Sequence, residues 1–160
     1  MIERIEHVGI AVRSIAEARQ LYEAMGLHVE AVEEVPHEGV RVALIPCGES
    51  HIELLEPTTD DSPIAKFLEK RGPGLHHLCL ASDDVRADDA RLRAGGFQVL
   101  RPEPTRGAGG CWVQFVHPRS AGGVLLELSE SPHPPTPSPA PSLPPSPGEG
   151  ERDSGVPRAS

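Results

Sequence analysis

An internal repeat restricts the possible folds of this chain more than any other feature of its sequence. The segment IEHVGIAVRSI at 5–15 matches LHHLCLASDDV at 75–85 with an offset of 70 residues. The offset aligns His7 with His77 and Ile10 with Leu80. Self-similarity at a fixed offset indicates that one supersecondary unit occurs twice and that the two copies are built alike.

Each copy carries the signals of a short helix after its first strand. Ser14 and Asp84 correspond under the offset, and both are residue types that cap helix N-termini. Glu17 completes a capping-box pattern with Ser14. Gly26 and Gly96 also correspond, and each is placed to end a helix. Each copy is therefore predicted to begin as a strand followed by a helix of about 11 residues.

Three further strands are predicted in each copy, because these segments are rich in Val, Ile and Leu and are bounded by Gly and Pro. They span 27–35, 39–47 and 50–57 in the first copy, and 97–102, 111–118 and 123–129 in the second. Residues 62–71 read as a linking helix, with Pro63 at its start and Gly72 at its end. The predicted fold is α+β, with two tandem βαβββ modules at about 2–57 and 74–131.

The composition divides the chain into one domain, residues 1–131, and a tail, residues 132–160. Ten of the 18 prolines lie in the tail, where few residues are apolar. Such a segment cannot bury enough apolar surface to offset its ordering entropy. We therefore expect a disordered Pro/Ser-rich tail that serves as a spacer, with a PxxP-type docking site as the alternative.

Charge and cysteine content argue against several classes of partner. The net charge of -9, without a basic stripe, argues against nucleic acid and anionic membranes. No apolar run approaches the roughly 20 residues of a membrane span, and the acidic N-terminus MIERIEHVGIAV is unlike a signal peptide, so a cytoplasmic location is predicted. The three cysteines are scattered, which fits neither a disulfide framework nor a cysteine-based zinc site.

The repeat also distinguishes between two adjacent histidines. Side chains along a strand alternate between its two faces. Val8 and Ile10 take the face that packs on the helix, so His7 lies on the opposite face. The offset groups His77 with His7 and leaves His76 on the packing face. Both selected histidines are followed on their own face by small residues, which leaves space for a ligand: Gly9, Ala11, Cys79 and Ala81.

Two carboxylates, Glu53 in HIELLEP and Glu127 in GVLLELS, are bracketed by apolar residues. The strand around Glu127 is apolar on both faces and therefore buried, and a buried carboxylate must be paired or bind a metal. A solvent-facing position remains open for Glu53. Together, His7, Glu53, His77 and Glu127 are two His-plus-Glu units that suit a divalent transition metal. The residues leave the metal open among cobalt, zinc, nickel, manganese and magnesium.

Several motifs make residues 2–131 resemble the methylmalonyl-CoA epimerase family of the vicinal oxygen chelate, or glyoxalase-like, superfamily. They are HVGIAV, HIELLEP, GPGLHHLCL, RGAGG and FVHPRSAGGVLLELSE. The resemblance implies the vicinal oxygen chelate fold, in which curled mixed sheets of paired modules enclose a metal ion, and it implies a homodimer. By position it implies that the metal ligands are His7, His77 and Glu127, with Glu53 in the fourth ligand place. Cobalt is the metal that the family leads us to expect.

The resemblance further implies an isomerase that interconverts the C2 epimers of an acyl-CoA substrate, methylmalonyl-CoA, through a metal-stabilised enolate. Inversion requires a base on each face of the planar enolate, and the repeat relates Glu53 and Glu127 by a pseudo-twofold, so both are candidate catalytic residues. Some members of the family have a glutamate, proposed as a base, where this chain has Val42. Candidates for binding the coenzyme A phosphates are Lys66, Lys70, Arg71, Arg106 and Arg119.

Two alternative functions remain open. The first is another enzyme of the superfamily, a glyoxalase-like lyase or a ring-cleaving dioxygenase, but one Tyr and three Phe provide little material for an aromatic pocket. The second is a non-enzymatic member that binds a small molecule without a metal. All four ligand positions are filled in this chain, which favours the metal-dependent enzyme.

Overall fold

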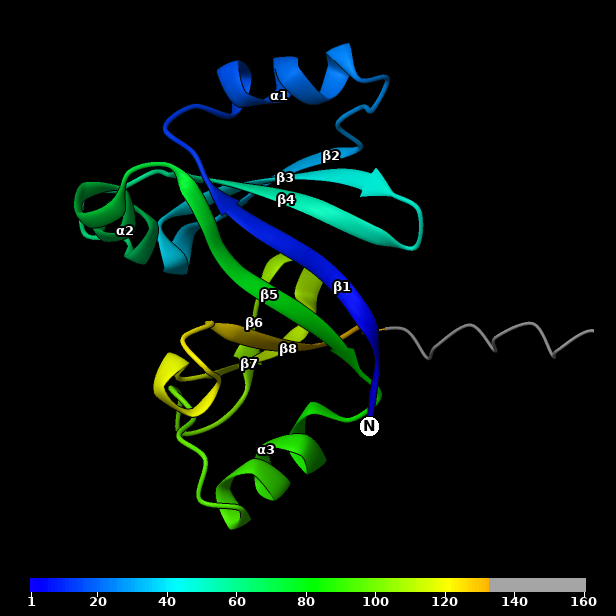
Figure 1. Cartoon of the computed structure of the whole chain (residues 1–160), viewed down its shortest axis with the longest axis vertical. Helices are drawn as coiled ribbons and strands as arrows, with labels where there is room; N and C mark the ends of the chain where they lie inside the picture. Colours follow the sequence, from blue (N-terminus) through cyan, green and yellow to red (C-terminus); the bar gives the residue numbers. More distant parts are fainter. Residues whose placement is uncertain (133–160) are drawn as a thin grey trace, which may run out of the picture.

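The two copies of the repeat form the two halves of one curled sheet (Figure 1). The computed structural model describes residues 1–132, so the tail predicted to be disordered lies outside the described residues except for Pro132. The first module comprises β1 (Ile2–Ala11), α1 (Ile15–Ala24), β2 (Ala31–Val35), the short 3-10 helix η1 (Pro36–Glu38), β3 (Val40–Cys47) and β4 (Ser50–Pro57).

The second module repeats this order after the linking helix α2 (Pro63–Arg71). It comprises β5 (Gly74–Ser82), α3 (Val85–Ala94), β6 (Thr105–Arg106), η2 (Ala108–Gly110), β7 (Trp112–Val116), η3 (Pro118–Ser120) and β8 (Leu126–Glu130). The tandem βαβββ arrangement predicted from the sequence is thus confirmed. None of the helices in residues 1–132 is long and apolar enough to cross a membrane.

The modules join through their first strands. The strand order is β2-β3-β4-β1-β5-β8-β7-β6, and β1 pairs antiparallel with β5 at the centre. Val8 faces Leu78, its own partner under the 70-residue offset. A pseudo-twofold axis therefore passes between these two residues, and α1 and α3 lie at opposite ends of the sheet (Figure 1).

The two repeat-related helices are fixed to the sheet by equivalent contacts. The side chains of Ser14 and Asp84 cap α1 and α3 as the sequence predicts. In addition, a carboxylate at the end of each module's last strand accepts a hydrogen bond from the first helical N–H. Glu56 accepts from Ile15 at 2.6 Å, and Glu130 accepts from Val85 at 2.9 Å. Free N–H groups at a helix start need such acceptors, and each module supplies a glutamate from the equivalent place in its last strand.

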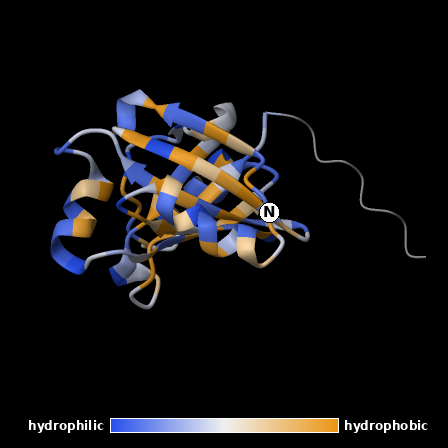
Figure 2. Ribbon diagram, turned by 90° about the horizontal axis from the view of Figure 1, so that it is seen from above, coloured by the Kyte–Doolittle hydropathy of each residue, from blue (hydrophilic) through white to orange (hydrophobic). Residues whose placement is uncertain are grey.

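Hydrophobic residues pack on both faces of the first module's sheet. Alternation along β4 sends Leu54 beneath α1, and it sends Leu55 toward α2. The cluster under α1 contains Val12, Ile15, Ala43, Ile45 and Leu54. The cluster facing α2 contains Ala11, Val35, Val40, Val42, Leu55, Ile64 and Leu68. Figure 2 shows the resulting mixture of hydrophobic and hydrophilic positions along the strands.

The predicted strand at 97–102 is wrong. This segment makes only an isolated bridge between Val99 and Val116, and the edge strand β6 is reduced to Thr105 and Arg106. Pro102 and Pro104 have no backbone N–H to donate to a neighbouring strand, so the segment cannot continue the ladder. It forms an irregular loop that leads into β6.

The curl of the sheet brings its two edges together. Glu33 on β2 accepts a hydrogen bond from the backbone N–H of Gly109 at 2.9 Å. The side chain of His37 lies 3.0 Å from the carbonyl oxygen of Arg106. These contacts join the β2 edge of the first module to the β6 edge of the second. The concave face is therefore enclosed on this side.

Candidate metal centre

The four side chains predicted as metal ligands come together at the centre of the concave face. His7, Glu53, His77 and Glu127 lie on β1, β4, β5 and β8, which are neighbours in the sheet. Each side chain is buried. The strand pairing explains the meeting, because Gly9 is opposite Glu53 on one side and opposite His77 on the other.

The donor atoms of this cluster are spaced like the ligands of one metal ion. The Nε2 atoms of His7 and His77 are 2.9 Å apart. From Glu53 Oε2 the distances to these nitrogens are 3.3 and 3.5 Å, and from Glu127 Oε2 they are 3.9 and 3.1 Å. Donors that share a divalent ion at about 2.1 Å lie roughly 3.0–3.5 Å from one another. Two imidazoles and two carboxylates at this spacing fit a divalent transition metal.

The electrostatics of the cluster also favour a cation. Burial, together with the charge of Glu127, raises the pKa of Glu53 to about 8. Burial lowers the pKa of His7 to about 4. Burial alone would raise the pKa of Glu127, but the hydrogen bond and charge of His77 outweigh it and leave this pKa lowered. Without a cation, the cluster therefore favours an ionised Glu127 beside a protonated Glu53, and a divalent ion would relieve the penalty on ionising Glu53 as well.

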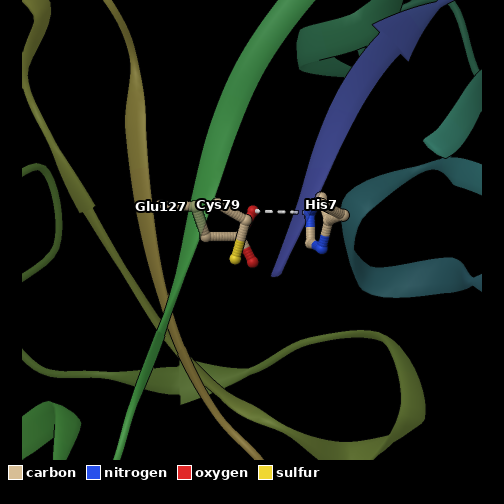
Figure 3. Close-up of side chains that lie close together, drawn as sticks. All are labelled: His7, Cys79 and Glu127. Atoms are coloured by element: carbon tan, nitrogen blue, oxygen red, sulfur yellow. Dashed lines mark ion pairs between the residues drawn. The ribbon is translucent and has the colours of Figure 1, made fainter. Parts of the chain in front are cut away.

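A thiol adjoins the cluster. Cys79 on β5 lies opposite His7 on one side and opposite Glu127 on the other, and Figure 3 shows the three side chains converging. Burial raises the pKa of the Cys79 thiol, so the group stays protonated. The sequence predicted Cys79 as one of the small residues on this face. The structure adds that its sulfur is within reach of the same donors.

Gly9 makes room for the side chain of His77 rather than for a bound small molecule. A Cβ atom at this position would lie 2.3–2.7 Å from three atoms of the His77 imidazole. The ring of His77 thus rests directly on the Gly9 backbone. The small residue expected to leave space for a ligand instead sets the position of one of the four donors.

His76 lies beside the cluster but contributes no atom to its four donors. Its ring packs edge-on against Phe67 of α2, with the ring centroids 5.0 Å apart. Its Nδ1 lies 2.9 Å from Nδ1 of His77, on the side of that ring away from the cluster. Of the two adjacent histidines, His77 therefore supplies the Nε2 that meets His7. His76 buttresses its ring.

Three members of the cluster, Glu53, His77 and Glu127, line a cavity of about 200 Å³. Val42, the residue in place of a glutamate in some relatives, also lines it. So do Glu38 and Arg101, which the sequence did not identify as site residues. Neither has a chemical counterpart at its offset position in the other module, so the repeat could not reveal them. The remaining lining residues are mostly apolar.

A second, more open cavity of about 670 Å³ runs along α2 and reaches His76 and His77. Lys66, Lys70 and Arg71, three of the five cations predicted to meet phosphates, line it. Arg106 instead lies over the ring of Trp112, 3.9 Å from its centroid, and donates to the carbonyl of Gly110. Arg119 is exposed on η3.

Comparisons with known proteins agree with this architecture. Residues 6–115 match the model of the glyoxalase/bleomycin resistance protein/dioxygenase superfamily. The ethylmalonyl-CoA/methylmalonyl-CoA epimerase of Cereibacter sphaeroides is 42% identical over 133 residues, which cover 81% of this chain and 99% of that protein.

Solved structures that resemble this chain include methylmalonyl-CoA epimerases as well. A Streptomyces coelicolor methylmalonyl-CoA epimerase variant in complex with 2-nitronate-propionyl-CoA is 38% identical, with a TM-score of 0.79 over 83% of this chain and 100% of that one. A methylmalonyl-CoA epimerase in complex with methylmalonyl-CoA and NH4+ is also 38% identical. Its TM-score is 0.81, over 86% of this chain and 100% of that one.

Proposed function

The chain belongs to the glyoxalase/bleomycin resistance protein/dioxygenase superfamily and, within it, to the methylmalonyl-CoA epimerase family, and from this membership we propose that it interconverts the two C2 epimers of methylmalonyl-CoA. The observation that carries the proposal is the cluster of His7, Glu53, His77 and Glu127, three of which, Glu53, His77 and Glu127, line a cavity. Two carboxylates related by a pseudo-twofold suit a reaction that moves a proton from one face of a carbon to the other.

We assign His7, Glu53, His77 and Glu127 as the residues that would hold a divalent metal ion. When bound, such an ion would supply Lewis-acid stabilisation of the negative charge that develops on the substrate oxygens. The support for this assignment is the spacing and burial of the four donors. Cys79 stands next to these donors but is left out of the assignment, because its repeat partner Gly9 offers no donor.

Glu53 and Glu127 are the proposed catalytic pair. One carboxylate would take the C2 proton, and the other would return a proton to the opposite face. After this turnover the two carboxyl groups have exchanged protonation states, so they are set for the reverse reaction. Equivalent register supports this pairing, since Glu53 is opposite Gly9 and Glu127 is opposite Cys79, which is the repeat partner of Gly9. Val42 lines the same cavity and cannot transfer a proton. Glu38, the third carboxylate of the cavity, is paired with Arg101, so the two buried glutamates are the proposed bases.

The cavity along α2 is the proposed path of the coenzyme A arm. It meets the cavity beside the metal cluster at Pro63, His76, His77 and Leu125, which line both. A thioester placed there would point its acyl group toward the cluster and its phosphates toward Lys66, Lys70 and Arg71. Phosphate groups pair favourably with such cations.

The test is the fate of the C2 proton of methylmalonyl-CoA in deuterated water. The metal-loaded protein should convert each epimer into the other and incorporate solvent deuterium at C2. A metal analysis of the same preparation should find about one divalent ion per four-donor site. Failure of the metal-loaded protein to invert either epimer would overturn the proposal. Production of a different product would then point to the lyase or dioxygenase alternatives.

Three finer expectations come from the family resemblance, and each has its own measurement. We propose cobalt as the native metal, which elemental analysis of protein purified without added metal would identify. We propose a homodimer, which sedimentation analysis would detect. We propose a cytoplasmic location, which fractionation of the source cells would test.

A further inference from the structure

The cavity beside the metal cluster has an unbalanced set of charged groups. Three carboxylates line it, those of Glu38, Glu53 and Glu127. Among the described residues that line it, Arg101 is the only Lys or Arg side chain. An anionic acyl group entering this cavity would be repelled by the carboxylates, so a fixed cation on the wall has a large effect on which acyl groups enter.

The backbone of Arg101 is held by a hydrogen-bond network, although it lies in an irregular loop. Its carbonyl oxygen accepts hydrogen bonds from Gln114 at 3.0 Å and from Arg93 at 2.6 Å. Gln114 is fully buried and also donates to Asp89 at 2.9 Å, and Arg93 donates to the same carboxylate. Arg93 further donates to the carbonyl of Pro102 at 3.0 Å. A loop of this kind is usually mobile, but this network fixes the backbone position from which the Arg101 side chain extends.

The side chain of Arg101 is also held by several contacts, and it lines the same cavity as Glu53, His77 and Glu127. Its guanidinium lies over the ring of Phe115, 4.9 Å from the centroid. Phe115 in turn meets the ring of His77 edge-on, with centroids 6.2 Å apart. One guanidinium nitrogen donates to Glu38 at 2.6 Å, and the other donates to Thr105. Within residues 1–132 these two contacts occupy only part of the five-donor fork of an arginine.

We propose that Arg101 recognises the free carboxylate of a malonyl-type acyl-CoA and that Glu38 occupies the same guanidinium when no substrate is bound. This inference rests on the proposed function and adds the group that selects a carboxylated acyl chain over a neutral one. The guanidinium matches a carboxylate in shape and charge, and it is preorganised on Phe115. Arg101 is thus a specificity-determining residue, distinct from the glutamates that move the proton.

The experiment compares two coenzyme A thioesters that differ only in the carboxylate. Binding of malonyl-CoA and of propionyl-CoA is measured by calorimetry on the metal-loaded, full-length protein. Arg101→Gln should weaken malonyl-CoA binding by roughly tenfold or more and should change propionyl-CoA binding by less than about twofold. Arg101→Lys keeps the positive charge and should retain part of the preference.

Two further variants separate recognition from structure. Glu38→Gln removes the competing anion, so it should bind malonyl-CoA at least as tightly as the parent protein. Arg19→Gln is the matched control, because Arg19 pairs with Glu23 on the exposed surface of α1. It should change neither affinity.

Equal weakening of both thioesters by Arg101→Gln, or no weakening of either, would overturn the inference. So would a parent protein that binds malonyl-CoA no more tightly than propionyl-CoA. Neither result bears on whether the parent protein inverts methylmalonyl-CoA, because the binding measurement requires no turnover. Failure of the proposed function is read separately, from the absence of inversion.

Discussion

The Nε2 atoms of His7 and His77 lie 2.9 Å apart, although 70 residues separate the two histidines in the chain. The register of the central strands produces this contact, because Val8 is paired with Leu78, its own repeat partner. The residues beside that pair are then placed symmetrically about the pseudo-twofold axis. Each module supplies one histidine and one glutamate, so neither module alone holds the complete cluster.

The first prediction concerns the two adjacent histidines of β5. His77→Ala should lose the divalent metal, because it removes the donor that lies between His7 and Glu127. His76→Ala should keep the metal, because the His76 ring packs on Phe67 outside the donor set. Elemental analysis after dialysis against a defined metal buffer measures both. Metal loss in His76→Ala with retention in His77→Ala would show that the ligand assignment is reversed.

The second prediction concerns the glycine beneath His77. Gly9→Ala should displace the His77 imidazole, because the new Cβ would lie only 2.3–2.7 Å from three of its ring atoms. A misplaced ligand should lower metal affinity by roughly 10- to 100-fold. Gly74→Ala, three residues before His77 on the same strand, is the control, since its Cβ would meet no atom within 4 Å. Metal titration of both variants is the measurement, and equal affinities would contradict the prediction.

The third prediction concerns the buried amide that anchors the loop of Arg101. Gln114→Leu leaves the Asp89 carboxylate and the Arg101 carbonyl without this donor. We expect unfolding free energy to fall by about 1–3 kcal/mol. Gln20→Leu on the exposed face of α1 is the control and should change stability by less than about 0.5 kcal/mol. Urea unfolding of both variants tests this, and an unchanged midpoint for Gln114→Leu would refute it.

Local patterning was sufficient to predict most of the fold. The 70-residue offset aligned the helix caps Ser14 and Asp84, and the structure has both caps and both modules. Strand alternation also grouped His77 with His7. The burial of Glu53 could not be read from its strand, which carries polar neighbours. Its burial results from the curl of the sheet, which depends on contacts between distant segments.

The parts that sequence reasoning missed lie where the two edges of the sheet meet. The segment 97–102 has the composition of a strand, but Pro102 prevents it from continuing the ladder. Arg101 and Glu38 meet across the module boundary at 2.6 Å, and 63 residues separate them in the sequence. Their positions do not match under the repeat offset, so the symmetry that identified the metal cluster gave no indication of this pair.

The last prediction concerns the two carboxylates as separate bases. An epimerase with one base on each face of the substrate loses inversion when either base is removed, but it can retain exchange at the remaining face. Glu53→Gln keeps the shape of the side chain and one oxygen while removing the basic group. In this variant Glu127 should still exchange the C2 proton of one epimer with solvent deuterium, without inverting it. The other epimer should neither exchange nor invert.

Glu127→Gln should show the opposite preference between the two epimers. Because Glu127 lies 3.1 Å from Nε2 of His77, its substitution also affects the proposed metal site, so metal content must be measured beside each exchange rate. Proton NMR of each pure epimer in deuterated water follows exchange, and a stereospecific coupled assay follows inversion. Glu130→Gln is a suitable control, since that carboxylate holds the start of α3 rather than facing the cluster. If metal-loaded Glu53→Gln inverts both epimers at the parent rate, Glu53 is not a base, and the second proton donor must be sought among the other groups that line the cavity.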